Sequence, residues 1–159
     1  MGMIIGPTPW WQSNIVKSCP VGTTLPDGSR IICKAGGTAW IVAPACTEVG
    51  STWANSAIVG CVSPTGDLPS VSCWATLCSR LIACGFNPAD WFVPNCVQVS
   101  TPGYVCRTQW DSYANCCAYW TSTESSSIYA WGICAGGSLS AASPKGTVNC
   151  VRAMRCVTY

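Results

Sequence analysis

The chain has 159 residues, eight Lys and Arg against six Asp and Glu, and a formal net charge of +2. This length suits one ordinary domain, and the basic residues are too scattered to form the positive stripe that binds nucleic acid. There is no histidine, which excludes His-dependent triads, His-ligated metal sites and imidazole pH switches. With 49% apolar and only 9% charged residues, the composition is that of a folded domain.

No apolar run approaches the roughly 18 residues that a membrane-spanning helix needs, so we expect no membrane span. Residues 1–6 lack the basic start and the apolar core of a signal peptide. Either the numbering begins after processing, or the protein leaves its cell by a route that needs no signal, such as lysis.

The amino-terminal residues 1–18 are predicted to form an extended arm ahead of a domain at residues 19–159. The segment Gly6-Pro-Thr-Pro9 disfavours regular structure, and two indole rings follow it without amphipathic context. These rings either cover their own domain or dock on a neighbouring subunit. The candidate assembly residues are Pro9, Trp10 and Trp11.

The first half of the domain carries a turn, a strand and a helix. Asp27-Gly28 predicts a hairpin turn, and the run 38–43, which follows Gly36-Gly37, predicts a buried strand. Apolar residues recur at helical spacing over 69–84, and Gly85 is the expected stop.

The second half predicts a loop-rich region followed by short strands. Residues 85–118 contain three prolines and no clear periodicity. Strands are expected at 118–121, 128–134 and 147–157, with 136–146 read as a turn region. The pattern is that of an α+β domain.

Fourteen of the residues are cysteine, and no two of them have the C-x2-C spacing typical of zinc or redox sites. An even number at dispersed positions favours a disulfide framework, and therefore a working place outside a reducing cytosol. Spacing does not determine the pairing, although the adjacent Cys116 and Cys117 are expected to take different partners. The disulfide candidates are Cys19, Cys33, Cys46, Cys61, Cys73, Cys78, Cys84, Cys96, Cys106, Cys116, Cys117, Cys134, Cys150 and Cys156.

Three segments of the last third, in this order, resemble the DUF1566 family: Tyr119-Trp-Thr-Ser-Thr-Glu124, Ala130-Trp-Gly-Ile133 and Val151-Arg-Ala-Met-Arg-Cys156. Upstream, Asp90-Trp-Phe-Val-Pro94 is similar to the family's Asp-Trp-Arg-Leu-Pro, with Phe92 in place of the usual Arg. The resemblance covers about residues 36–157. The chain departs from the family in a shortened second helix near residues 96–99 and in its many cysteines.

The resemblance implies a C-type-lectin-like fold, in which one or two helices flank a twisted antiparallel sheet and a long loop region carries the binding surface. Such domains occur in secreted bacterial adhesins and in bacteriophage virion proteins, and residues 36–44 and 102–111 look like phage-encoded members. The structural motif residues that it implies are Trp91, Pro94, Tyr119, Trp120, Glu124, Trp131, Arg152 and Arg155.

Structural roles are expected for several of these motif residues. The rings of Trp120 and Trp131 alternate with small polar residues and are predicted to pack the core. Glu124 is expected to accept hydrogen bonds, with Arg152 or Arg155 as the candidate partner. Asp90 either shapes a turn or binds an ion. The turn is favoured because the calcium and sugar motifs of lectin-type carbohydrate domains are missing.

No enzymatic site is predicted, because the six carboxylates are too scattered for a glycosidase pair and a nucleophilic cysteine would lack a histidine base. We expect a non-enzymatic bacteriophage virion structural protein without cofactor or metal, either a tail fibre or tip component or a decoration subunit of capsid or tail. Its partners would be other virion proteins or copies of itself, and as a receptor reader a host surface glycan. The alternatives are a secreted bacterial adhesin that binds glycans and an enzyme related to formylglycine-generating proteins, which share the lectin-like fold.

Overall fold

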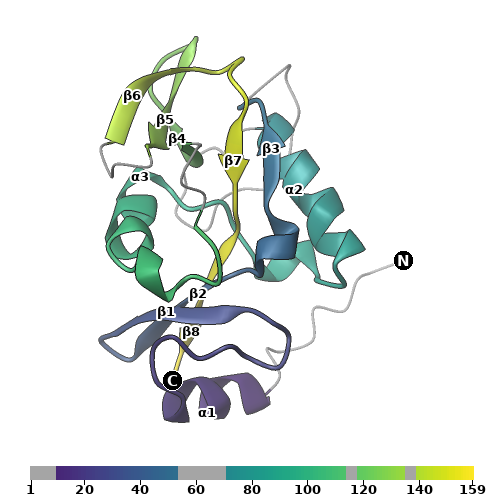
Figure 1. The fold of residues 1–159 in the computed structure, drawn as a ribbon, viewed down its shortest axis with the longest axis vertical. Coiled ribbons are helices and arrows are strands. Elements are labelled where there is room, and N and C mark those ends of the chain that lie inside the picture. The colour runs from purple at the N-terminus through teal and green to yellow at the C-terminus, as the bar shows by residue number, and fades with distance from the viewer. Residues whose placement is uncertain (1–9, 54–70, 114–117, 135–138) are drawn as a thin grey trace.

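A computed structural model describes residues 10–53, 71–113, 118–134 and 139–159 (Figure 1). Over these residues, the helices α1 (Trp10–Ser18), α2 (Val71–Ala83) and the short α3 (Cys96–Gln98) accompany strands that form two sheets. The predicted α+β class is therefore confirmed.

The smaller sheet has the strand order β1-β2-β8 and is antiparallel throughout. Strands β1 (Arg30–Ala35) and β2 (Thr38–Val42) form a hairpin, and β8 (Met154–Thr158) pairs with the other edge of β2. Helix α1 lies against this sheet beside the carboxyl terminus (Figure 1). The predicted strand at 38–43 is thus the centre of its sheet.

The larger sheet has the order β3-β7-β4-β5-β6, in which β4 and β7 are parallel and the other neighbours antiparallel. Its strands are β3 (Val49–Ser51), β4 (Tyr119–Glu124), β5 (Tyr129–Ile133), β6 (Leu139–Pro144) and β7 (Asn149–Val151). The expected single antiparallel sheet is therefore wrong. The predicted strand 147–157 divides at Arg152 and Ala153, so that β7 stays in this sheet while β8 joins the other.

Helix α2 confirms the sequence prediction over its described part, and residues 69 and 70 lie outside the described residues. Trp74, Leu77 and Leu81 face the core. Gly85 has a φ of +84°, a left-handed conformation that ends helices without the steric cost a Cβ would bring. The Phe86 amide then donates to the carbonyl of Leu81 at 2.9 Å.

The amino-terminal segment differs from the extended arm that the sequence suggested, because residues 10–18 are helical. Val16 is fully buried in the core and Ile15 packs against it, so tertiary burial stabilises a helix too short to persist alone. Pro9 lies outside the described residues. Whether Trp10 and Trp11 dock on another subunit stays a prediction.

The region after α2 is loop-rich as expected, with short helical turns η2 (Pro88–Asp90), η3 (Val99–Tyr104) and η4 (Arg107–Gln109) around α3. A further short turn, η1 (Ala45–Thr47), follows β2. Strand β6, in contrast, was missed, because its Ser- and Ala-rich sequence shows no apolar alternation. Its pairing with β5 defines it.

Two groups of buried side chains form the core, one around Trp74, Trp91 and Trp120 and a smaller one around Phe92 and Tyr119. Trp120 is 1% exposed, which confirms its predicted core position. Trp131 is only half-buried and belongs to neither group, so that prediction is wrong. Within the described ranges, no helix has the length and apolar character to cross a membrane.

Candidate functional site

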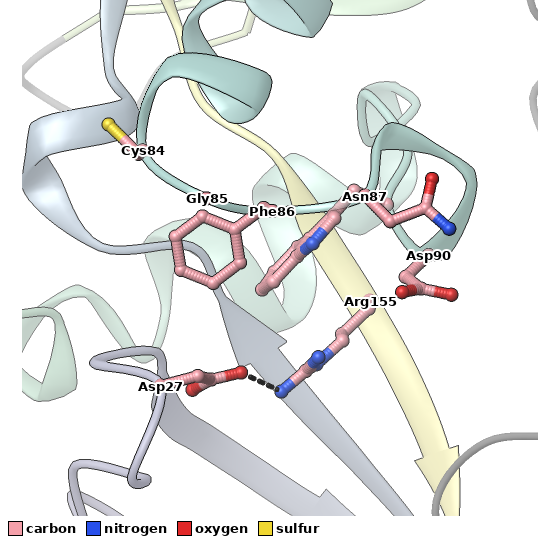
Figure 2. Close-up of a pocket in the computed structure, with 8 residues that line it drawn as sticks. Asp27, Cys84, Gly85, Phe86, Asn87, Asp90 and Arg155 are labelled. Carbon is pink, nitrogen blue, oxygen red and sulfur yellow. Dashed lines mark hydrogen bonds and ion pairs between the residues drawn. The ribbon is translucent and has the colours of Figure 1, made fainter.

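A cavity of about 460 Å³ lies where the turn before β1, the segment after α2 and strand β8 meet (Figure 2). Two of the motif residues, Trp91 and Arg155, line it. The other lining residues come from two separate stretches of the chain: Asp27, Cys84, Gly85, Phe86, Asn87 and Asp90.

The aromatic wall of this pocket is fixed by a backbone bridge. Phe92 and Met154 each donate an amide to the other's carbonyl at 2.9 Å, which places Trp91 next to Arg155. The Arg155 guanidinium lies 4.5 Å from the centre of the Trp91 ring. Phe86 meets the same indole edge-on at 5.6 Å between ring centres.

Arg155 is anchored at one end of its guanidinium. Its Nη2 donates to the Asp27 carboxylate at 2.8 Å and to the Ser29 hydroxyl at 3.1 Å, and Figure 2 shows the side chain reaching from β8 toward Asp27. Ser29 in turn donates its hydroxyl to Asp27 at 2.5 Å. Burial alone would raise the pKa of Asp27, but the Ser29 hydrogen bonds and the Arg155 charge hold it below the ordinary 3.8.

The other N–H groups of the guanidinium make no hydrogen bond within the described residues. Both hydrogen bonds that Arg155 makes within the described residues use Nη2, and its buried Nε has no partner among them. The residue is 7% exposed, so an unpaired donor here is costly unless a ligand or water supplies an acceptor. Among the residues that the structure describes, this unsatisfied guanidinium in a pocket wall is the strongest indication of a binding site.

The rim of the pocket carries the side chains of Asn87 and Asp90, both exposed. Asn87 caps η2 by accepting the Ala89 amide at 3.2 Å, and Asp90 is the last residue of that turn. The turn expected at Asp90 is therefore present, but Asn87 supplies its cap. The Asp90 carboxylate makes no ion pair within the described residues.

This arrangement suits a neutral, hydroxyl-rich ligand. Arg155 supplies donors, Asp90 supplies acceptors, and the Phe86 and Trp91 rings supply an apolar wall. Two carboxylates face one guanidinium in the pocket, so the lining has a formal charge of −1, which disfavours a small anion.

The remaining motif residues lie elsewhere in the fold. The Pro94 carbonyl accepts the Ser122 amide of β4 at 3.0 Å, and the Tyr119 hydroxyl donates to Glu48 at 2.6 Å. Glu124 pairs with Lys145 and with neither arginine, which corrects the expected partners. These contacts are structural.

Arg152 has a fully satisfied environment. Its Nε donates to the Ala43 carbonyl at 2.9 Å and its Nη1 to the Ser112 carbonyl at 2.5 Å. Its Nη2 pairs with Asp111, and Glu48 lies 3.5 Å from Nη1. This arginine joins the end of β2 to the loop near residue 112.

Sequence reasoning missed Asp27, Phe86 and Asn87 as site residues. Asp27 was seen only as a turn former, and that turn is confirmed by the Gly28 φ of +85° and the Leu25–Ser29 hydrogen bond. Aspartate is common in tight turns, so its presence there does not indicate a binding role. Its pairing with Arg155, 128 residues away, carries no local signal.

No two of the ten cysteines whose side chains are described lie at disulfide bonding distance from each other: Cys19, Cys33, Cys46, Cys78, Cys84, Cys96, Cys106, Cys134, Cys150 and Cys156. Cys61, Cys116 and Cys117 lie outside the described residues, and the side chain of Cys73 is not described. The same part of the chain holds no cluster of three potential metal-ligating side chains. The predicted disulfide framework stays a prediction.

No family model matches this chain, and no curated protein matches it. The likeness to the DUF1566 family therefore remains an interpretation of the motifs at residues 90–94, 119–124, 130–133 and 151–156.

Proposed function

We propose that this chain is a non-enzymatic bacteriophage virion protein that attaches to a host surface by binding a neutral glycan in the pocket beside Arg155. The lectin-like fold implied by the motifs is part of the proposal. The long loop region over 85–113, which supplies most of the pocket, supports it.

One observation carries the binding function: neither Nη1 nor Nε of Arg155 has a hydrogen-bond partner among the described residues, and this side chain lines the wall of a cavity. A glycan hydroxyl is an acceptor of suitable size for these donors, and its own O–H can donate a hydrogen bond to the Asp90 carboxylate at the rim. Aromatic rings beside such polar groups stack against the apolar faces of sugars, and Phe86 is half-buried and lines the pocket.

The chemistry of the pocket favours binding over catalysis. The Asp27 carboxylate is held by Arg155 and Ser29, and its pKa lies below 3.8, so it is a poor general acid at neutral pH. A glycosidase needs one carboxyl group with a raised pKa. Neither the pocket nor the chain contains a histidine to replace it.

The virion setting rests on the sequence. The resemblance to phage-encoded DUF1566 members and the many cysteines favour a particle component released into oxidising surroundings. In this setting residues 1–18, with Trp10 and Trp11, would contact another virion subunit or a second copy, while the pocket faces outward.

The test is binding of the full chain to an array of neutral and acidic glycans, comparing wild type with Asp90→Asn. The amide oxygen of asparagine still accepts a hydrogen bond but carries no charge, and a hydrogen bond to a charged group contributes about 1 kcal/mol more than a neutral one, so we expect affinity for a neutral glycan to fall roughly fivefold. The matched control is Arg80→Gln, which neutralises an exposed charge on α2 outside the pocket and should bind like wild type.

Several outcomes would contradict the proposal. Binding only of acidic glycans, equal binding by Asp90→Asn, or no saturable binding to any glycan each argues against the neutral-glycan pocket. If the pocket binds glycan but the chain is absent from purified phage particles by mass spectrometry, the secreted adhesin is the better description.

A further inference from the structure

Two cysteine side chains from distant parts of the chain meet beside the pocket. Cys46 lies in η1, and Cys84 follows the last residue of α2, 38 residues later. The Cys84 sulfur lies 3.4 Å from the carbonyl oxygen of Cys46. Burial and the neighbouring Cys84 thiol raise the pKa of Cys46.

Both backbones at this contact are held in place, so the approach of the sulfurs is set by the fold. The Ala45 amide donates to Asp111 at 2.7 Å, and Asp111 is itself paired with Arg152. The Cys84 amide donates to the carbonyl of Arg80 at 3.0 Å. Cys46 is exposed and Cys84 half-buried, which leaves the pair open to a reagent from solution.

A second pair of cysteines from distant parts of the chain also lies close together. Cys33 on β1 and Cys106, between η3 and η4, pack against the same smaller core group. Strand β1 contacts both η3 and η4, which brings the two cysteines near each other, and burial together with the Cys33 thiol raises the pKa of Cys106. The Cys106 amide is held by the Pro102 carbonyl at 2.9 Å.

We propose that Cys46 with Cys84 and Cys33 with Cys106 are the sites of two intrachain disulfides, formed when the reduced chain meets a small-molecule disulfide. One protein thiolate attacks a sulfur of that molecule, forms a mixed disulfide and expels one small thiol. The second protein thiolate then displaces the other small thiol. Two protein thiols are oxidised, one external disulfide is reduced to two thiols, and the two protons end on the released thiols.

The first of these bonds has a consequence for the pocket. Cys84 immediately precedes Gly85 and Phe86, and Figure 2 shows its side chain at the edge of the pocket, away from the Asp27–Arg155 pair. A bond to Cys46 would tie the start of this wall to η1 without filling the cavity. This effect on ligand binding rests on the proposed function, whereas formation of the bond does not.

The test is peptide mapping of the full chain after equilibration with oxidised and reduced glutathione, with free thiols alkylated. Cleavage after Lys, Arg, Asp and Glu gives peptides 35–48 and 81–90, which carry Cys46 and Cys84 as their single cysteines. Peptide 31–34 carries Cys33 alone, and a further cut after Tyr104 isolates Cys106 in 105–107. We expect 35–48 linked to 81–90, and 31–34 linked to 105–107.

Variants separate a specific pair from random oxidation. Cys46→Ser should leave Cys84 fully alkylated, whereas the matched control Cys156→Ser should keep the 35–48 to 81–90 link. The reaction should also quicken as pH rises, because the attacking species is the thiolate and the pKa of Cys46 is raised.

The proposal would be overturned if these four cysteines are recovered as alkylated thiols at an oxidising glutathione ratio. It would also be overturned if they are recovered in other disulfide pairings. Because the mapping needs no ligand, such a result leaves glycan binding untouched. Correct pairing with no glycan binding would instead refute the proposed function alone.

Discussion

Two arginines three residues apart in the closing segment, Arg152 and Arg155, occupy similar but not equivalent surroundings. Each is buried, each pairs with an aspartate, and each lies over an indole, that of Trp110 at 5.3 Å or Trp91 at 4.5 Å. Arg152 uses Nε and both terminal nitrogens within the fold, whereas Arg155 uses only Nη2 within the described residues. The first is therefore a structural tie, and the second retains capacity for a ligand.

The largest effect is expected at Arg152. Arg152→Met should lower the free energy of unfolding by about 3 kcal/mol, the lower end for breaking a buried pair, because Asp111 and Glu48 keep some access to water. Denaturant unfolding of the full chain measures this loss. A change no greater than that of the exposed Arg80→Gln would show that the hydrogen bonds of Arg152 do not stabilise the fold.

Arg155→Lys should separate binding from stability. Lysine keeps the charge near Asp27 but lacks the planar fork, so we expect a stability loss of about 1 kcal/mol and a loss of glycan affinity of roughly tenfold or more. Isothermal titration beside denaturant unfolding gives both quantities. A stability loss of Arg155→Lys as large as that of Arg152→Met, or an unchanged glycan affinity, would contradict the contrast between the two arginines.

The smallest effect is expected at Tyr113, whose ring contacts Trp110, the indole over which Arg152 lies. Its ring lies 5.1 Å from that of Trp110, its buried hydroxyl has no hydrogen-bond partner in the described part of the chain, and burial raises its pKa to about 12. An ordinary tyrosine titrates near pH 10, so the unfolded chain loses the Tyr113 proton at a lower pH than the folded chain does. The contribution of this group to the free energy of unfolding is therefore fully present below pH 10 and is lost as the pH rises toward 12.

Tyr113→Phe should therefore be neutral within about 0.5 kcal/mol at pH 7, because the missing hydroxyl makes no hydrogen bond within the described residues. Between pH 10 and 12 the variant should lose less stability than wild type, measured by thermal unfolding at each pH. Parallel alkaline curves for the two proteins would contradict the raised pKa.

Features that depend on neighbours along the chain follow from the amino-acid sequence. The apolar spacing of α2, the stop at Gly85 and the turn at Asp27-Gly28 are all local, and the structure confirms them over the described residues. The sequence also predicts the loop-rich stretch from residue 85 onward, because prolines interrupt every periodic pattern there.

The pairing of charges and the division of strands between the two sheets depend instead on long-range contacts in the folded molecule. Arg155 finds Asp27 across 128 residues, and Lys145 takes Glu124 although two arginines of the motif were the expected partners. The segment 147–157 splits between two sheets, and burial of Val16 turns the expected extended segment into α1. Ion pairs, sheet partners and short helices depend on which surfaces become buried together, and one-dimensional spacing does not contain that information.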